Sequence, residues 1–286
     1  MATDTAVSVR DEVALAADDV TRVFRPRRRG EQPVTALAGV SFRLPPGSAL
    51  GLVGASGSGK STLARLVTGL DHPTSGTISF GNMRVDRLRR GSLRRYRKHV
   101  QMVFQDPYAA LNPLHTVGYT LSRPVVNYLG LDGRRARDRV AGLLEAAGLT
   151  PAGQFEEKLP HQLSGGQRQR VVIAPALASE PDVIIAVEPV SMLDVSLRAG
   201  VLQLLDQLRR ERGMSLLYIT HDLLSARVVT SELLVLNQGQ VVEQGPTREV
   251  LRNPRHAYTR QLLAAIPDPF AAATPGSQQS PSGGIR

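Results

Sequence analysis

The hydrophobic residues of this chain follow two alternating patterns. Short apolar runs typical of strands occur at Val34–Leu44, Ser48–Val53, Thr77–Phe80, Val100–Phe104, Val183–Val187 and Ser215–Thr220. The last two are continuously apolar, as expected for parallel strands covered on both faces. Between the runs, helical patterns fill Lys60–Gly69, Arg134–Gly148, Gly165–Ala178 and Leu197–Arg212. This alternation predicts an α/β fold built on a doubly wound sheet.

The chain shows no change of composition that would divide it into two independent domains. We expect one domain over residues 13–267, because no repeat and no long Pro/Gly-rich linker interrupts it. Residues 1–12 are polar and are expected to be flexible. Residues 268–286 are rich in Ala, Gly, Ser, Pro and Gln and are expected to form a disordered tail.

Composition excludes several classes of protein. The 286 residues include no cysteine, which excludes disulfide scaffolds, cysteine-ligated zinc, iron–sulfur clusters and thiol nucleophiles. No apolar run reaches the roughly 18 residues of a membrane span, and the N-terminus lacks a secretory signal. We therefore expect a soluble intracellular protein. The formal net charge of +10 favours nucleic acid, anionic lipid or phosphate-rich ligands as partners.

Two basic runs account for part of this charge. Arg27–Arg29 lie between Pro26 and Gly30, which favours a solvated hairpin tip. Arg84–Lys98 contains eight Arg or Lys residues but a single aromatic residue, Tyr96. Nucleic-acid readers usually interleave aromatic residues for base stacking. We therefore expect solvated or membrane-side surfaces here, and no nucleic-acid site.

The segment Gly54–Ser61 (GASGSGKS) has the pattern of a phosphate-binding loop. It follows the apolar run SALGLV and precedes the helical pattern KSTLARLVTG. The glycines let successive backbone N–H groups point at phosphate oxygens, and the helix N-terminus adds its positive end. Lys60 supplies a charge for the β- and γ-phosphates, and the Ser61 hydroxyl is suited to Mg²⁺.

Two further apolar runs end in polar residues. Val183–Val187 is followed by Glu188, and the run LLYIT is followed by His221 and Asp222. Because the carboxyl ends of parallel strands meet at one edge of a sheet, both side chains are expected near the phosphate loop. Glu188 is then placed to polarise a water molecule that attacks a γ-phosphate. An ordinary exposed glutamate and a structural histidine remain the alternatives for each residue taken alone.

A second anion-binding pattern lies about a hundred residues after the phosphate loop. Ser164, Gly165 and Gly166 open a helical pattern within Leu163–Arg170 (LSGGQRQR). One nucleotide has no obvious need for two such sites, so each is expected to serve a different subunit.

Together these motifs resemble, in order, those of the ATP-binding subunits of ABC transporters over about residues 13–267. The resemblance implies a P-loop NTPase core with a parallel-rich sheet, an N-terminal antiparallel β subdomain and a helical signature subdomain. It also implies ATP and Mg²⁺ as ligands, with Ser61 and Gln105 on the metal and with Glu188, His221 and Gln105 as catalytic residues. The implied nucleotide-binding residues are Phe24, Gly54, Ser56, Gly57, Ser58, Gly59, Lys60, Ser61, Thr62, Ser164, Gly165, Gly166, Gln167 and Asp194.

Segments outside these motifs narrow the resemblance. FQDPYAALNP (104–113), VVEQGPTREVL (241–251) and NPRHAYTRQLLAAIP (253–267) look like the dipeptide, oligopeptide and nickel importer branch, with a C-terminal extension over about 235–267. This branch implies a peripheral subunit at the cytoplasmic face of the inner membrane that powers import of peptides or similar solutes. Implied partners are permease subunits, a second ATP-binding subunit, identical or homologous, and indirectly an external solute-binding protein; no nucleic acid is expected.

Two positions depart from the family pattern. Val187 stands where the family has an Asp that helps to hold the Mg²⁺ shell, and a valine offers no oxygen ligand. Pro175 stands where the family usually has Arg, inside the helical pattern that starts at the signature. These departures leave open a subunit that binds nucleotide but hydrolyses it poorly and relies on an active homologous chain. A DNA- or ribosome-associated ATPase is disfavoured, because the chain lacks the insertions of those proteins.

Overall fold

The computed structural model describes residues 15–25 and 32–266. The expected flexible N-terminus, the tail at 268–286 and the basic run Arg27–Arg29 lie outside these residues. Within them the strands are β1 (Leu15–Phe24), β2 (Val34–Leu44), β3 (Ala49–Val53), β4 (Ser75–Phe80), β5 (Met83–Arg84), β6 (Val100–Val103), β7 (Val183–Val187), β8 (Ser215–Thr220), β9 (Glu232–Asn237) and β10 (Gln240–Pro246).

Helices lie between many of these strands and after the last one. They are α1 (Lys60–Val67), α2 (Arg90–His99), α3 (Pro107–Ala110), α4 (Val117–Pro124), α5 (Gly133–Ala146), α6 (Gly153–Glu156), α7 (Gly165–Ile173), α8 (Val195–Arg212), α9 (Leu223–Val229), α10 (Thr247–Arg252) and α11 (Ala257–Ala264). Short 3₁₀ or π segments occur at Val85–Arg87, Val125–Leu129, Pro160–Gln162 and Ala174–Leu177.

The strands form two sheets. The first is antiparallel, in the order β2-β1-β4-β5, and the second has the order β10-β9-β3-β8-β7-β6. In the second sheet β3, β6, β7, β8 and β9 run parallel and β10 is antiparallel. All residues of β8 and all but the last of β7 are buried, as their continuous apolar runs predict, and β3 is buried throughout as well. The expected parallel-rich core with an antiparallel β subdomain is therefore confirmed.

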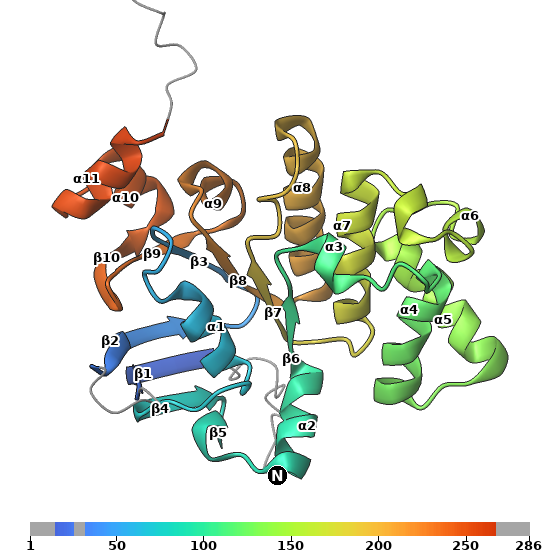
Figure 1. Ribbon diagram of the computed structural model, residues 1–286, viewed down its shortest axis with the longest axis horizontal. Coiled ribbons are helices and arrows are strands. Elements are labelled where there is room, and N and C mark those ends of the chain that lie inside the picture. The colour runs from blue at the N-terminus through green and yellow to red at the C-terminus, as the bar shows by residue number, and fades with distance from the viewer. Residues whose placement is uncertain (1–14, 26–31, 267–286) are drawn as a thin grey trace, which may run out of the picture.

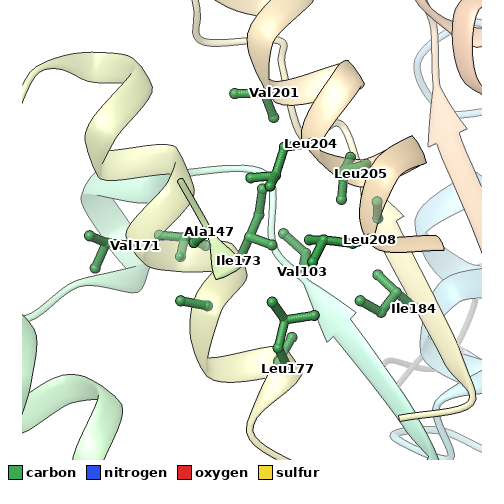
Figure 2. Close-up of a cluster of buried hydrophobic side chains, with 14 of the residues drawn as sticks. Val103, Ala147, Val171, Ile173, Leu177, Ile184, Val201, Leu204, Leu205 and Leu208 are labelled. Atoms are coloured by element: carbon green, nitrogen blue, oxygen red, sulfur yellow. The ribbon is translucent and has the colours of Figure 1, made fainter. Parts of the chain in front are cut away.

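Helices cover both faces of the parallel sheet. Along β7, Ile184 belongs to one buried cluster and Ile185 to the other, because successive side chains of a strand point to opposite faces. One cluster lies between the sheet, α1 and the antiparallel sheet. The other lies on the side of α7 and α8, where Val103, Ile184, Ile173 and Leu204 converge (Figure 2). The helices α4, α5 and α6 extend outward beside α7 as the expected helical subdomain (Figure 1).

The helix expected over Gly165–Ala178 is shorter than that. The α-helix ends at Ile173 and continues as a 3₁₀ turn over Ala174–Leu177. Pro175 explains the change, because it has no N–H to donate to the carbonyl of Val171 four residues earlier. The first turn of α7, which carries the signature, lies two helical turns away and keeps its cap. Pro175 therefore changes the end of this helix and leaves its beginning intact.

The basic run Arg84–Lys98 is not a uniformly solvated surface, and that expectation was wrong in part. From Arg90 onward the segment forms α2, whose Tyr96 is fully buried and donates to the carbonyl of Val67. Arg97 donates to the carbonyl of Gly69 at 2.8 Å and Lys98 to that of Tyr128 at 2.9 Å. These two cations therefore join α2 to neighbouring segments, and other arginines of the run stay exposed.

No helix among residues 15–25 and 32–266 has both the length and the apolar composition that a membrane crossing requires.

Candidate functional site

Four parallel strands deliver the candidate residues to one edge of the sheet. β3 leads into the loop 54–59, β6 is followed by Gln105, β7 by Glu188 and β8 by His221. The strands lie side by side in the order β3-β8-β7-β6, so their carboxyl ends meet at the same edge. This is the edge at which open α/β sheets bind ligands.

The loop between β3 and α1 is shaped by glycines that no other residue would replace. A Cβ atom on Gly54 would lie 2.2 Å from the carbonyl oxygen of Leu236, and one on Gly59 would lie 2.5 Å from that of Ala36. Gly59 also has a φ of +109°, in the left-handed region that favours glycine. The backbone therefore follows a tight path that ends at the N-terminus of α1, with its free N–H groups.

Lys60 folds back over this loop. Its ammonium donates to the carbonyl oxygens of Gly54 at 2.7 Å and Ala55 at 2.9 Å. An ammonium has three N–H bonds, so one remains for a ligand. Burial lowers the pKa of Lys60 from its usual value, and the negative charge of Glu188 opposes part of that shift. The lysine is thus held above the loop with a preformed orientation.

Glu188 and His221 are in direct contact. The imidazole Nδ1 of His221 lies 2.8 Å from Oε1 of Glu188, and the Thr220 hydroxyl donates to Oε2 at 3.2 Å. An ionised carboxylate only accepts hydrogen bonds, so Nδ1 carries the proton and Nε2 faces away from Glu188. Glu188 has a φ of +48°, an uncommon conformation for a non-glycine residue that is often found at functional sites.

A cavity of about 1300 Å³ unites these groups. Its lining includes most of the loop and all three implied catalytic residues: Ser56, Gly57, Gly59, Lys60, Ser61, Thr62, Gln105, Glu188 and His221. Gly54 and Ser58 are buried and do not line the cavity, and the Ser58 hydroxyl has no hydrogen-bond partner among the described residues. The structure thus brings together residues that the sequence spreads over 166 positions, from Ser56 to His221.

The signature residues lie apart from this cavity. Ser164 caps α7, accepting from the Gln167 N–H at 3.3 Å, and Gln167 Oε1 accepts from the Ser164 N–H at 3.0 Å. Gly165 and Gly166 lie next to Leu197 of α8. Asp194 is exposed at the start of α8, and none of these residues is among those that line the cavity. That these residues serve a second chain stays a prediction.

Phe24 is not part of the cavity lining in the described residues. It ends β1 and pairs with Val34, which does line the cavity. The guanidinium of Arg22 lies 4.6 Å above the Phe24 ring, and 42% of the residue is exposed. Stacking of Phe24 on a base stays a prediction.

Three residues of the cavity decide how well it could bind Mg²⁺: Ser61, Gln105 and Val187. Ser61 and Gln105 line the cavity with a hydroxyl and an amide, which suit Mg²⁺ when phosphate oxygens and water complete its shell. Val187 is also among the lining residues, and its side chain has no oxygen to offer a metal. In the described part of the chain, no group of three or more His, Cys, Asp or Glu side chains gathers in a way that would hold a metal without a phosphate ligand.

Sequence reasoning missed one wall of the cavity. It is formed by residues of α8, of α9 and of the segment 253–267, whose resemblance to the importer branch indicated no contact with the cavity. These residues include Val195, Arg198, Leu202, Leu224, Val228, Leu262, Ala265 and Ile266. Tyr258 was also missed: its hydroxyl accepts the N–H of Ala55 at 2.9 Å. The run that contains Tyr258 was noted only for its resemblance to the importer branch, and no local pattern indicates a contact with the loop.

Comparisons with known proteins agree with this geometry. The family model for ABC transporters matches residues 37–191, and the model for the oligopeptide/dipeptide transporter C-terminal region matches residues 242–283. The glutathione import ATP-binding protein GsiA of Salmonella typhimurium is 47% identical over 240 residues. Its Escherichia coli K12 counterpart is 46% identical over 239 residues. Each alignment covers 84% of this chain and 38% of the relative, so the chain spans well under half the length of these relatives.

Solved structures show the same architecture. The ATP-binding cassette MJ0796, a dimer bound to ADP and phosphate after hydrolysis, superposes with a TM-score of 0.73 at 33% identity. That match covers 82% of this chain and 99% of MJ0796. CbiO1 of Clostridium perfringens, part of the ABC transporter complex cbiONQ, gives 0.73 at 30% identity and covers 84% and 90%. This chain belongs to the ABC transporter family and is one of its ATP-binding cassettes.

Proposed function

We propose that this chain hydrolyses ATP to power a membrane importer of peptides or similar small solutes. The observation that carries the proposal is the convergence of Lys60, Gln105, Glu188 and His221 on one cavity. The match of residues 242–283 to the oligopeptide/dipeptide transporter model supports a peptide-type solute. So do the relatives named for glutathione import.

The phosphates of ATP are bound at the N-terminus of α1. The remaining N–H of the Lys60 ammonium points a full charge at the β- and γ-phosphates, and the free backbone N–H groups of α1 add partial charges. Ser56, Gly57, Ser61 and Thr62 line the same space. The close packing at Gly54 and Gly59 fits a loop whose backbone wraps a phosphate group.

Mg²⁺ would be held by Ser61 and Gln105, and when bound it neutralises charge on the phosphate oxygens. Glu188 accepts a proton from the attacking water molecule. The water oxygen bonds to the γ-phosphorus, and the bond between this phosphorus and the bridging oxygen of ADP breaks. The Thr220 hydroxyl and His221 orient the carboxylate, since each contacts a different oxygen. Nε2 of His221 faces away from Glu188, and an imidazolium at this position would donate its Nε2–H to a γ-phosphate oxygen, because that oxygen only accepts.

The proposed function requires a second ATP-binding subunit and permease subunits as partners. Ser164, Gly165, Gly166, Gln167 and Asp194 lie outside the chain's own cavity and would contact ATP on a second ATP-binding subunit, identical or homologous. A second cavity of about 730 Å³ beside Gln105 is lined by Phe104, Arg94, Arg97 and Arg123 and is suited to a segment of a permease subunit. In this role the chain would lie at the cytoplasmic face of the inner membrane. An external solute-binding protein would deliver the solute to the permease subunits. No nucleic-acid partner is proposed.

Two measurements test the proposal. The purified chain should show Mg²⁺-dependent ATP turnover that the Glu188→Gln variant loses. In the host strain, deletion of the gene should reduce uptake of labelled peptides or glutathione, and the wild-type gene but not Glu188→Gln should restore it. Uptake that is equal in the deletion and the parent for every peptide tested would contradict the proposed substrate class.

A second candidate function rests on Val187. Val187 is among the residues that line the cavity, and its side chain has no oxygen to support a metal, which favours a subunit that binds ATP and hydrolyses it poorly. None of the comparisons favours this candidate. Separate measurements of ATP affinity and turnover distinguish the two, because only this one predicts tight binding with little hydrolysis.

A further inference from the structure

The C-terminal helix α11 is fixed firmly against the rest of the fold. Both oxygens of Glu243 on β10 accept backbone N–H groups from the turn before α11, from Arg255 at 2.8 Å and from His256 at 3.0 Å. The His256 ring caps the helix by accepting the N–H of Tyr258 at 3.2 Å. Figure 1 shows α10 and α11 together at the end of the sheet that carries β9 and β10, with α10 beside α9.

Tyr258 links this helix to the phosphate loop. Its hydroxyl accepts the N–H of Ala55 at 2.9 Å, although 203 positions separate the two residues. Its half-buried ring packs against the larger core cluster. The hydroxyl is therefore held at the loop by a fixed ring on a fixed helix, and the contact does not depend on a flexible side chain.

The contact matters because it falls on the same peptide group as Lys60. The N–H of Ala55 and the carbonyl of Gly54 belong to one planar peptide unit. Tyr258 binds the N–H end, and the Lys60 ammonium donates to the carbonyl end at 2.7 Å. Hydrogen bonds at both ends of a peptide fix its orientation and reinforce one another. Rotation of this peptide would withdraw the carbonyl that orients the lysine.

The same helix also borders the cavity. Leu262, Ala265 and Ile266 line it together with Ser56, Gly57 and Lys60 of the loop. Any displacement of α11 would therefore change the wall of the cavity as well as the Tyr258 contact. The family match at residues 242–283, which contains α11, thus marks a segment that touches the phosphate loop.

We propose that Tyr258 is a positioning residue for ATP binding, which acts by orienting the Gly54–Ala55 peptide and through it Lys60. This inference rests on the proposed function, because it assumes that ATP binds at the phosphate loop. It assigns to the C-terminal extension a role in the nucleotide site, in addition to any role in assembly with membrane subunits.

The test compares ATP affinity and turnover of the full chain with those of Tyr258→Phe, which keeps the ring and removes the hydroxyl. Tyr119→Phe is the matched control, since Tyr119 is exposed on α4 and its hydroxyl makes no hydrogen bond among the described residues. Loss of one neutral hydrogen bond predicts an ATP dissociation constant and KM about 2–10-fold higher. The kcat at saturating ATP and the melting temperature without nucleotide should stay close to wild type.

The outcomes separate the two levels of the proposal. Weaker ATP binding in Tyr258→Phe, with Tyr119→Phe unchanged, supports the inference. If the Tyr258→Phe variant has a lower melting temperature without nucleotide, and this accounts for all of its loss of ATP affinity, Tyr258 is a structural residue only. That result would overturn the inference. Equal ATP affinity in wild type and Tyr258→Phe would overturn it as well. A wild-type chain that does not bind ATP would overturn the proposed function, and this inference with it.

Discussion

His221 Nδ1 lies 2.8 Å from Glu188 Oε1, so the ends of β7 and β8 are joined by their side chains as well as by the sheet. Glu188 is largely buried, with 11% of its side chain exposed, whereas 61% of the His221 side chain is exposed. The carboxylate is thus held from within by Thr220 and from the solvent side by His221. Both residues line the same cavity.

Glu188→Gln should abolish most ATP turnover and leave ATP binding nearly unchanged. The amide keeps the size of the side chain but is a far weaker base, and removal of a general base typically costs about 10²–10⁴-fold in rate. Single-turnover hydrolysis and equilibrium ATP binding measure the two effects separately. Turnover equal to wild type would exclude Glu188 as the base.

Val187→Asp should raise Mg²⁺-dependent turnover by about 10–100-fold, the usual effect of a residue that supports a metal's shell. Val187→Asn is the control, since it has the same size without the charge. The measurement is ATP turnover as a function of Mg²⁺ concentration. If the wild type and both variants respond alike to Mg²⁺, Val187 is a tolerated substitution.

Ser164→Ala should destabilise the chain by about 1 kcal/mol, because it leaves the Gln167 N–H without its cap. Denaturant unfolding measures this loss. Ser196→Ala serves as the control, since Ser196 is exposed on α8 and its hydroxyl makes no hydrogen bond within the described residues. An equal effect of both substitutions would contradict the capping role.

Glu243→Gln should remove a pH-dependent part of the stability. Burial raises the pKa of Glu243, but hydrogen bonds from the Arg255 and His256 N–H groups outweigh it and set the pKa below its usual 4.5. A carboxyl whose pKa is lower in the folded state stabilises the fold above its unfolded pKa and loses that contribution as the pH falls through the folded pKa.

The stability difference between wild type and Glu243→Gln should therefore be about 1 kcal/mol near neutral pH, after allowance for solvent screening. It should shrink towards zero as the pH falls below 4.5. Urea unfolding across this range measures it, with the exposed Glu145→Gln as control. A difference that does not change with pH would show that the charge of Glu243 is not what holds the turn.

Most of the parallel sheet and its catalytic edge follow from the sequence alone. The continuous apolar runs at Val183–Val187 and Ser215–Thr220 coincide with β7 and β8. Because such strands must be buried and parallel, the residues after them must share one edge. That constraint placed Glu188, His221 and the phosphate loop together without any knowledge of their contacts. The strands β1, β5, β9 and β10 were not predicted. The burial patterns of β1 and β10 are irregular and carry a weak signal, whereas β9 is mostly buried and its apolar run LLVL was overlooked.

Sequence by itself therefore determined which strands carry the candidate site residues at their ends, because hydrophobicity and its periodicity are local properties of the chain. Tertiary structure alone decided that Tyr258 reaches Ala55 and that His221 bonds Glu188. Such contacts join residues that are distant along the chain, and they depend on the order of strands in the sheet and on the attachment of α11 to β10 and to the loop after β3. No short-range pattern encodes either of these, since both arise only when the whole core is assembled.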